Sequence, residues 1–396
     1  MQTKAFLQAN SILQRLEEHE HEAFFVGGCV RDFLLNRPIH DIDIVTSAFP
    51  EQIQNIFPQV IPVGIAHGTV IVRHEQKSYE VTTYKHYLNK QITANNKQKD
   101  IAEDLRLRDF TMNALAMNRS GEIIDIWGGR ADIHQQLIRV VADEKGRFLE
   151  DPLRILRAVR FVSQLGFRIE KATLEYMNEL RASLESVAIE RVSSEWEKII
   201  TGAFFQRSLT YLKDSKVYQY LPIFNQYPEI FEEIPSNISK FDSFAAFITY
   251  MHFSNENIAV RRWLKAWNCS NKTKQQINIF IQAYNNLQQT GLNPWLVYQL
   301  PEAMDASFVR LAHQLIPTYE ITQEQMQQLR SQLPIASARE LEVNGREIMT
   351  LFPNLSRGPW IKELLQRIEY EVVFSRLPNK NNKIKEWILC NPPEQN

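Results

Sequence analysis

The spacing of apolar residues changes about a third of the way along the chain. Before Arg139, apolar runs and polar/apolar alternation predict strands at Ala23–Val26, Asp41–Val45, Val60–Val63, Thr69–Arg73, Ser78–Thr83 and Glu122–Ile126. Helical spacing predicts helices at Phe6–His19 and Cys29–Asn36, and after Arg139 at Leu153–Leu165, Lys171–Leu184 and Val192–Ile200. The remainder, to about Trp387, continues as helices separated by turns that contain proline. The pattern predicts an α+β protein, with a mixed sheet and helices first and helices alone afterwards.

The composition narrows the class of protein. A chain of 396 residues has room for two to four domains of roughly 100–200 residues each. Its 44% hydrophobic residues exclude bulk disorder, and 45 basic against 46 acidic residues exclude a generally polybasic protein. The three cysteines are widely spaced and form no disulfide or zinc pattern. There is no signal-peptide pattern and no run of roughly 18 apolar residues, so we expect a cytoplasmic protein without a membrane span.

Two glycines separate the first predicted strand from the helix that follows it. Gly27 and Gly28 let the backbone approach a phosphate closely, and Arg31, one turn into the helix, can pair with that phosphate. A glycine pair alone is usually only a turn. This order of elements, a strand, two glycines and a helix that carries an Arg, therefore indicates a phosphate site only in combination with other residues.

Two aspartates lie in the next predicted strand. Asp41 and Asp43 are two positions apart, so both carboxylates face one side while the neighbouring isoleucines face the core. Two carboxylates on one face suit Mg²⁺, and two such ions would activate a 3′ hydroxyl and hold a triphosphate for in-line attack. Glu80, in the predicted strand Ser78–Thr83, is either a third carboxylate of this site or an exposed strand residue.

A second candidate segment spans residues 104–113. Arg106 and Arg108 lie beside a predicted helix start, and Asn113 follows one turn later. Together these side chains are suited to hold a sugar and phosphates. Surface salt bridges are the more common explanation for such a segment taken alone.

A third candidate segment begins with Asp151 and Pro152, which predict a helix start. Arg154, Arg157 and Arg160 recur every three residues and form a stripe, ordinarily a solvated basic face. An Asp and an Arg one turn apart can also recognise a base edge that carries an amine donor beside a ring-nitrogen acceptor. Cytosine and adenine have that edge, whereas uracil and guanine have the reverse. The other two arginines are then left for phosphate.

Taken together, these segments resemble the bacterial class II tRNA nucleotidyltransferases, the CCA-adding enzymes of the polymerase-β-like superfamily. The motifs occur in the family's order over roughly residues 23–200, with a fainter match at GPWIKELL and residues 375–379. They are FVGGCVRDFLL, DIDIVTSA, PVGIAHGTV, YEVTT, RLRDFTMNALAM, DIWGGRADI, EDPLRILRAVRFVSQLGF and ERVSSEWEKI.

The resemblance implies an enzyme that adds C, C and A to the 3′ end of tRNA from CTP and ATP without a nucleic-acid template. It implies Asp41 and Asp43 as Mg²⁺ ligands, with Asp151 and Arg154 as the pair that selects the base. The implied nucleotide contacts are Gly28, Arg31, Arg108, Asp151, Arg154, Arg157 and Arg160. The chemistry and spacing of the residues add Gly27 and Asn113 as candidates.

The resemblance also implies four parts. These are a catalytic polymerase-β-like head (1–138), a helical neck that recognises the base (139–204), a helical body (205–290) and a helical tail (291–396). The body and tail would hold the tRNA. Candidate phosphate contacts there are Arg261, Arg262, Lys265 and Lys362. Nothing in the sequence defines the oligomeric state.

One segment departs from the family pattern. CCA-adding members carry an Arg after the VTT-aromatic run and then an Arg-Arg-Pro stretch, in a loop that helps the site change from CTP to ATP. Here Lys85 and His86 follow the run. The segment 84–103 is a few residues shorter than in the family and is rich in Asn, Lys and Gln. Relatives that add only the two cytidines differ in this region, so full CCA addition and CC-only addition both stay open.

Other classes of protein share some of these features. A bacterial poly(A) polymerase shares the head and neck, but such enzymes often carry basic extensions that this chain lacks. A tRNA-binding protein without catalysis would not need intact Asp41, Asp43 and Arg31. A metal-dependent sugar transferase would not need the pair of Asp151 and Arg154.

Overall fold

The computed structural model describes residues 4–85, 87, 101–255 and 257–393. The chain forms two compact units, Met1–Ser236 and Asn237–Asn396. The predicted loop Leu88–Asp100 lies outside the described residues. The finer division into head, neck, body and tail stays a prediction.

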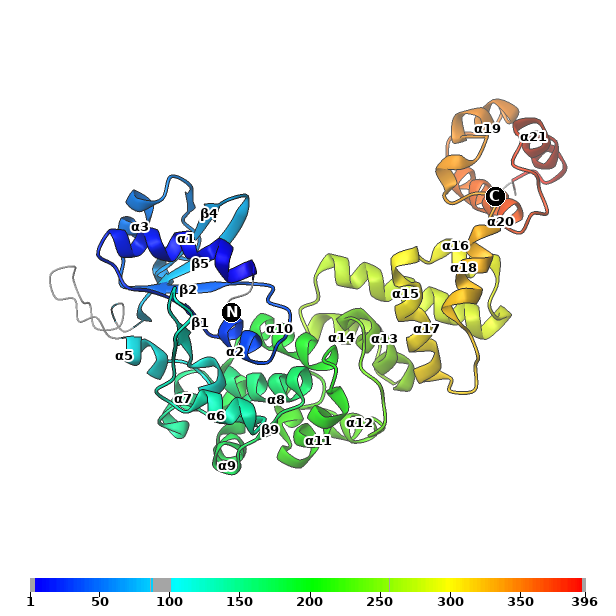
Figure 1. The fold of residues 1–396 in the computed structure, drawn as a ribbon. Helices are drawn as coiled ribbons and strands as arrows, with labels where there is room; N and C mark the ends of the chain where they lie inside the picture. Colours follow the sequence, from blue (N-terminus) through cyan, green and yellow to red (C-terminus); the bar gives the residue numbers. More distant parts are fainter. Residues whose placement is uncertain (1–3, 86, 88–100, 256, 394–396) are drawn as a thin grey trace. The chain divides into compact units, whose positions relative to one another are not determined.

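The first unit contains a seven-stranded sheet in the order β3-β4-β5-β2-β1-β6-β7. Figure 1 labels four of its strands, β4, β5, β2 and β1. Neighbouring strands pair antiparallel, except that β2 and β5 run parallel. All six predicted strands are present, and β6 is an additional strand too short for alternation to indicate it. The strands are β1 (Ala23–Val26), β2 (Asp43–Thr46), β3 (Val60–Ile61), β4 (Thr69–His74), β5 (Lys77–Thr83), β6 (Ala116–Met117) and β7 (Ile123–Ile124).

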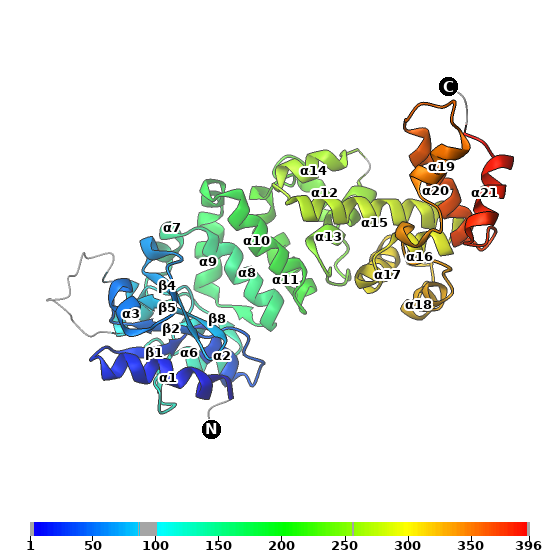
Figure 2. The same cartoon turned by 90° about the horizontal axis from the view of Figure 1, so that it is seen from above.

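The sheet buries side chains on both faces, because successive residues of a strand point to opposite sides. Phe25 of β1 packs against Phe6 of helix α1 (Lys4–Glu18), with ring centroids 4.8 Å apart. Its neighbour Val26 belongs to a second buried cluster, which includes Tyr84 and Leu105. Figures 1 and 2 show α1 lying along one side of the sheet. Apolar packing on both faces therefore fixes the strand ends that carry the candidate site.

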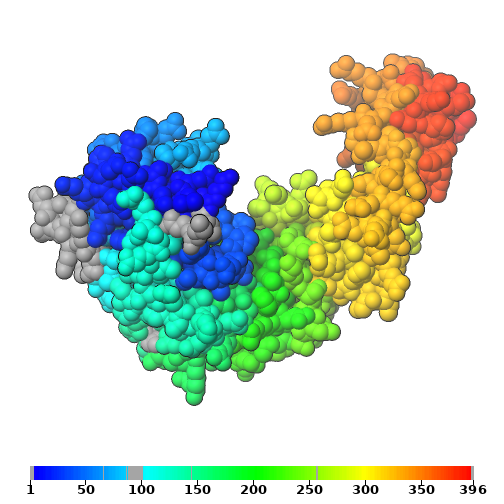
Figure 3. Space-filling view, viewed as in Figure 1, coloured from blue at the N-terminus to red at the C-terminus, as the bar shows by residue number. Residues whose placement is uncertain are grey.

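The rest of the first unit is mainly helical. Its further helices are α2 (Gly28–Leu34), α3 (Pro50–Ile56), α5 (Ile101–Arg106), α6 (Gly129–His134), α7 (Glu144–Glu150), α8 (Leu153–Leu165), α9 (Lys171–Leu180), α10 (Ile189–Ile200), α11 (Phe205–Ser215) and α12 (Pro228–Glu232). Helix α8 packs against α10 and α11 (Figure 2). A Cβ on Gly202, between α10 and α11, would lie 2.2 Å from Oγ of Ser163. Glycine at this position therefore allows the close approach to α8. In the space-filling view the blue and cyan surface of the sheet region is continuous with the green surface of these helices (Figure 3).

A second, two-stranded sheet crosses the predicted boundary at Arg139. Strand β8 (Leu137–Ile138) pairs parallel with β9 (Arg168–Ile169). The expectation of helices alone after Arg139 is therefore wrong at β9, because a strand of two residues has no periodic pattern. A smaller correction concerns β2, which begins at Asp43, so Asp41 precedes the strand rather than lying in it.

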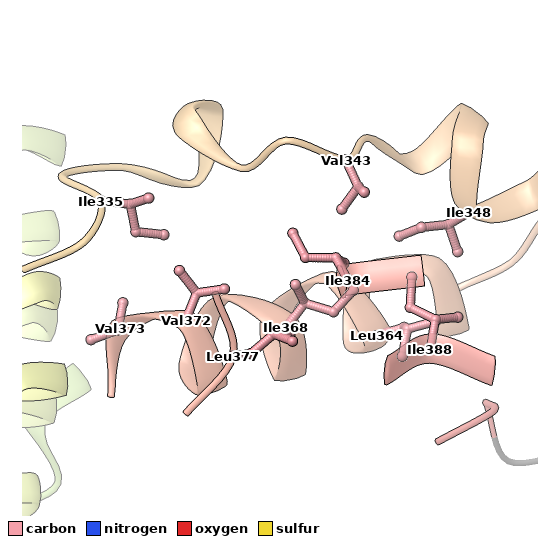
Figure 4. Close-up of a cluster of buried hydrophobic side chains, with 10 residues drawn as sticks. All are labelled: Ile335, Val343, Ile348, Leu364, Ile368, Val372, Val373, Leu377, Ile384 and Ile388. Carbon is pink, nitrogen blue, oxygen red and sulfur yellow. The ribbon is translucent and has the colours of Figure 1, made fainter. Parts of the chain in front are cut away.

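The second unit is helical in its described part. Its helices are α13 (Phe244–Ser254), α14 (Val260–Ala266), α15 (Asn271–Thr290), α16 (Pro294–Gln299), α17 (Asp305–Leu315), α18 (Gln323–Ser331), α19 (Gly345–Leu351), α20 (Trp360–Val373) and α21 (Asn381–Cys390). Figure 4 shows ten buried aliphatic side chains, among them Ile348, Ile368 and Ile384, that join α19, α20 and α21. Among the described residues of either unit, no helix is both long and apolar enough to cross a bilayer.

Candidate active site

A glycine turn leads from β1 into α2. Gly27 has φ 73°, a left-handed conformation that L side chains rarely adopt. A Cβ at this position would lie 2.8 Å from Nη1 of Arg108, so the absence of a side chain lets the guanidinium reach the turn. Nη2 of Arg108 lies 3.4 Å from a carboxylate oxygen of Asp104. Its Nε is buried and makes no hydrogen bond within the described part of the chain. The structure thus brings Arg108 to Gly27, and it places Nη2 of the predicted Arg31 3.7 Å from where a Cβ on Gly28 would lie. The phosphate site itself stays a prediction.

Replacing Gly27 by alanine is expected to lower the free energy of unfolding by about 1–3 kcal/mol, because the backbone conformation becomes strained. It should also raise the KM for nucleotide, because the new methyl group displaces Arg108. Gly128→Ala is the matched control, since Gly128 has φ 74° but a Cβ added there would meet no atom within 4 Å. Thermal unfolding and steady-state kinetics on both variants separate the strain from the displacement. An unchanged KM in Gly27→Ala would contradict the assignment of this turn to nucleotide binding.

Three carboxylates line one pocket at the edge of β2. Asp43 lies opposite Glu80 in the parallel pairing of β2 with β5, and Asp41 lies two residues before it. These three residues contribute to a pocket of about 390 Å³, together with His40 and Tyr79. None of the three carboxylates makes a hydrogen bond or ion pair with a side chain of the described residues. The structure therefore favours Glu80 as part of the acidic site over an unrelated strand residue.

Electrostatics link the three carboxylates. Although the Asp43 side chain is exposed, desolvation by the surrounding protein raises its pKa, the Arg108 guanidinium lowers it and the Asp41 charge raises it again. The pKa of Glu80 is raised by desolvation and by the charges of Asp43 and Asp41. Mutual repulsion of this kind favours a bound cation. No group of three acidic, His or Cys side chains within the described ranges is already close enough to enclose a metal ion.

A chain of hydrogen bonds connects α2 with α8. Nη1 of Arg31 donates to Oδ1 of Asn113 at 2.7 Å, and Nδ2 of Asn113 donates to Asp109 at 3.0 Å. Arg157 of α8 donates to the same Asp109 carboxylate through Nε at 2.9 Å. Burial alone would raise the pKa of Asp109, but the Arg157 guanidinium and the bond from Asn113 outweigh burial and lower it. Asp109 is therefore ionised, and it ties two predicted nucleotide-binding arginines into one network.

Three guanidinium groups surround the ring of Phe161 in α8. Their central carbons lie 4.1 Å (Arg160), 5.2 Å (Arg31) and 5.9 Å (Arg157) from the ring centroid. Arg160 also pairs with Glu195 of α10 at 3.0 Å, and burial followed by the Arg157 charge lowers the pKa of Arg160 to about 10. Only 10% of the Arg160 side chain is exposed. The interpretation of a solvated basic stripe is therefore wrong for this residue.

The predicted base-selecting pair lies at the start of α8, but its two side chains are not bonded to each other. Oδ2 of Asp151 accepts a hydrogen bond from Arg191 at 2.8 Å. Arg154 donates to the backbone carbonyls of Arg147 at 3.0 Å and Leu107 at 3.3 Å. Arg154 thus lies beside the segment that carries Arg108. Both members of the pair are anchored by other residues, so their hydrogen-bonding directions are partly fixed.

Sequence reasoning missed four residues that hold this site together: Asp109, Phe161, Arg191 and Glu195. All four lie within the family motifs, but their residue types and spacing alone predict no role for them. Glu195 had a signal, because it falls on the apolar face of α10 between Val192 and Ile199, where a charged residue needs a buried partner. Phe161 had none, since one more apolar residue in α8 looks like ordinary core.

The chain matches three family models. They are the poly A polymerase head domain (residues 23–139), the "Probable RNA and SrmB-binding site of polymerase A" (residues 166–227) and the tRNA nucleotidyltransferase domain 2 (residues 239–388). The first covers the sheet, the glycine turn and the carboxylates. The third lies wholly within the second unit.

Similar proteins match over their whole length. The CCA-adding enzyme of Oceanobacillus iheyensis is 43% identical, with 100% of both chains covered. The CCA-adding enzyme of Anoxybacillus flavithermus is 37% identical over 99% of this chain and 98% of its own. Among solved structures, the Bacillus stearothermophilus CCA-adding enzyme in complex with CTP matches with a TM-score of 0.84 and 32% identity, over 98% of each chain. The Thermotoga maritima CCA-adding enzyme in complex with tRNA shares the fold, with a TM-score of 0.62 and 20% identity, over 98% of this chain and 96% of that one.

Proposed function

The chain belongs to the family of CCA-adding enzymes, which are nucleotidyltransferases, and from this premise we propose that it completes the 3′ end of tRNA with C, C and A. The substrates would be CTP, ATP and tRNA, and no nucleic-acid template would be needed. The observation that carries the proposal is that an acidic pocket and a group of arginines lie close together in the first unit. Asp43 of the acidic pocket lies close enough to Arg108 for the two charges to interact. Arg154 at the start of α8 donates to the carbonyl of Leu107, the residue before Arg108.

Nucleotidyltransferases of this family generally use a divalent metal ion. The residues fit one, because the pocket offers carboxylate oxygens that repel one another and that no side chain in the described ranges neutralises by an ion pair. We propose Mg²⁺, held by Asp41 and Asp43 with Glu80 beside them, since hard oxygen ligands suit it. When bound, it would lower the pKa of the attacking hydroxyl and offset charge on the phosphates.

The chain's own groups would orient the nucleotide. The Gly27–Gly28 turn leaves space for the triphosphate, and Arg31 and Arg108 would balance its charge. The 3′ oxygen of the tRNA would attack the α-phosphorus as the bond to the β-phosphate oxygen breaks, so pyrophosphate leaves. Glu80, with its raised pKa, lies at the pocket wall where a hydroxyl proton could be accepted.

Base choice would depend on the start of α8. We assign it to Asp151 and Arg154, with Arg191 and the carbonyls of Arg147 and Leu107 holding the two side chains in direction. Arg157 and Arg160 would support this edge from within the network around Phe161. We also propose a cytoplasmic location, which agrees with tRNA as the substrate.

Asp151→Ala is expected to reduce discrimination between CTP and UTP by about 10- to 100-fold, since one carboxylate–amine contact to a base is typically worth about 1–3 kcal/mol. The affinity for tRNA should change little. Competition between the four nucleotides in single-turnover assays measures the ratio directly. Glu175→Ala is the control, because this exposed carboxylate of α9 pairs with Lys171 at the surface and has no proposed contact with the base or with Arg154. Unchanged rejection of UTP and GTP in the Asp151 variant would remove the base-selecting role.

The question of full or CC-only addition depends on a loop whose residues 86 and 88–100 lie outside the described part of the chain. Full-length similarity to enzymes named CCA-adding supports the complete addition, and no comparison favours the CC-only alternative or a poly(A) polymerase. The direct test of transfer uses a tRNA transcript that lacks CCA, with labelled CTP and ATP. We expect incorporation that stops when EDTA removes the divalent ion and returns when Mg²⁺ is restored. Incorporation that persists in EDTA would contradict the metal assignment.

A further inference from the structure

Helix α20 of the second unit has two faces of different character. Leu364, Ile368 and Val372 are fully buried in the core of this unit (Figure 4). Another face of the same helix carries Glu363, Arg367 and further polar or aromatic residues, and these line an open pocket. Trp295 and Trp387 in the pocket wall also pack against the core, but Glu363 and Arg367 are exposed, so the core does not account for these two charged residues.

The pocket lies between α16, α20 and α21 and has a volume of about 640 Å³. That size lies within the range of roughly 300–1,000 Å³ typical of small-molecule sites. Its lining includes three aromatic residues, Trp295, Tyr370 and Trp387. The volume is therefore sufficient for a single nucleobase.

The aromatic rings and one guanidinium of the pocket pack against one another. The rings of Trp295 and Tyr370 lie 5.1 Å apart at 68°, so they meet edge to face. The Arg367 guanidinium lies 5.6 Å from the centroid of Trp387 and adds a second planar surface. Tyr370 remains 36% exposed. Exposed aromatic and guanidinium planes of this kind are how proteins hold unpaired bases of RNA.

The charges in the pocket select among the bases. The carboxylate of Glu363 has no hydrogen-bond or ion-pair partner within the described residues, and the carboxylate of Glu371 has only the Arg376 guanidinium at 3.8 Å. Arg376 offsets the charge of Glu371 and also lies 5.8 Å from the Tyr370 ring centroid. The unpartnered carboxylate of Glu363 favours a base edge that donates N–H groups. Guanine alone among the four bases places two adjacent donors, N1–H and N2–H, where one carboxylate can accept both. Adenine and cytosine offer one donor beside an acceptor, and uracil offers one donor between two acceptors.

We propose that this pocket binds one unpaired guanine of the tRNA, outside the 3′ end that is being extended. The proposal rests on the proposed function, because it takes tRNA as the substrate. Tyr370 and Trp387 would stack on the base, and Glu363 would accept its two N–H groups. The site would anchor tRNA during successive additions, and it takes no part in the chemistry.

The test measures the affinity of the full-length protein for a tRNA transcript lacking CCA, by fluorescence anisotropy without nucleotides. Tyr370→Ala should weaken binding about tenfold, whereas Tyr370→Phe, which keeps the ring, should bind like the unmodified chain. Glu363→Gln should weaken binding by a similar factor. Glu386→Gln is the matched control, because this exposed residue of α21 pairs only with Lys383 at the surface. Melting curves for each variant establish that it is folded.

Two further RNAs identify the contact. A hairpin that carries only the acceptor stem, closed by a loop of uridines, should bind equally well to all variants. The unpaired guanines of the tRNA are then changed to adenine one at a time. One of these changes should weaken binding to the unmodified protein as much as Glu363→Gln does. The same changed tRNA should bind Glu363→Gln no more weakly than the original tRNA does. The proposal would be overturned if folded Tyr370→Ala and Glu363→Gln bound tRNA as tightly as the unmodified chain does. Losses of the same size for the hairpin and for tRNA would overturn it as well. The proposed function fails separately, if the unmodified chain binds tRNA in this way but transfers no nucleotide to it.

Discussion

Asp43→Asn is expected to lower kcat for nucleotide transfer by about 10²- to 10³-fold, the range found when one preorganised electrostatic group is removed from an active site. Asparagine keeps the shape of the side chain but removes the charge that would bind a cation. The affinity for tRNA should be retained, because Asp43 has no proposed contact with it. Single-turnover rates with CTP measure the effect.

A control variant and a pH–rate profile accompany this measurement. Asp214→Asn, at an exposed position of α11 in the same unit, is the control and should keep the full rate. The charge of Asp43 contributes to the raised pKa of Glu80, so the acid limb of the pH–rate profile should move to lower pH in the Asp43 variant. Transfer at the unmodified rate in Asp43→Asn would contradict the assignment of β2 to the chemistry.

Asp109→Ala is expected to lower the free energy of unfolding by about 3 kcal/mol, because it removes the buried carboxylate that accepts from Arg157 and Asn113. Arg157 then keeps only the longer pair with Glu195, at 3.9 Å. Chemical denaturation monitored by circular dichroism measures the loss. Glu179→Ala is the contrasting control, because both side chains of its ion pair with Lys145 are half exposed, and water screens such a pair so that its loss should change stability little. Similar losses in the two variants would contradict the account of the network.

The same carboxylate makes stability depend on pH. Its pKa is lowered in the folded protein, so its contribution is fully present above the unfolded pKa of about 4 and disappears as the pH falls through the lower folded value. The unmodified chain should therefore lose stability in acid more steeply than Asp109→Asn, which has no proton to bind. Unfolding free energies measured from pH 6 downwards for both proteins test this difference. Parallel curves would show that Asp109 is not the titrating group.

The sequence predicted the parts of the fold that repeat a pattern over several residues. Helix α8 was predicted at its observed bounds because its apolar positions recur over thirteen residues. Strands β8 and β9 were not predicted, because pairs of residues carry no period and their pairing is set by tertiary packing.

The candidate site also contains some features that the local sequence predicts and others that depend on the fold. The glycine turn and the aspartates follow from local chemistry, since each motif needs only a few neighbouring residues. The network of Asp109, Arg157, Arg160 and Glu195 joins positions up to 86 residues apart in the chain, and only the fold brings them together. The sequence also placed Arg154, Arg157 and Arg160 on one helical stripe. It could not indicate that Phe161 lies among the guanidinium groups.

The most direct test of the central claim counts the nucleotides that the protein adds. A tRNA ending at the base before the CCA position is incubated with CTP, ATP and Mg²⁺, and the products are separated at single-nucleotide resolution. The account predicts three additions, the third only when ATP is present. Products that stop at two cytidines with ATP present, or no extension by a protein that is folded, would contradict it.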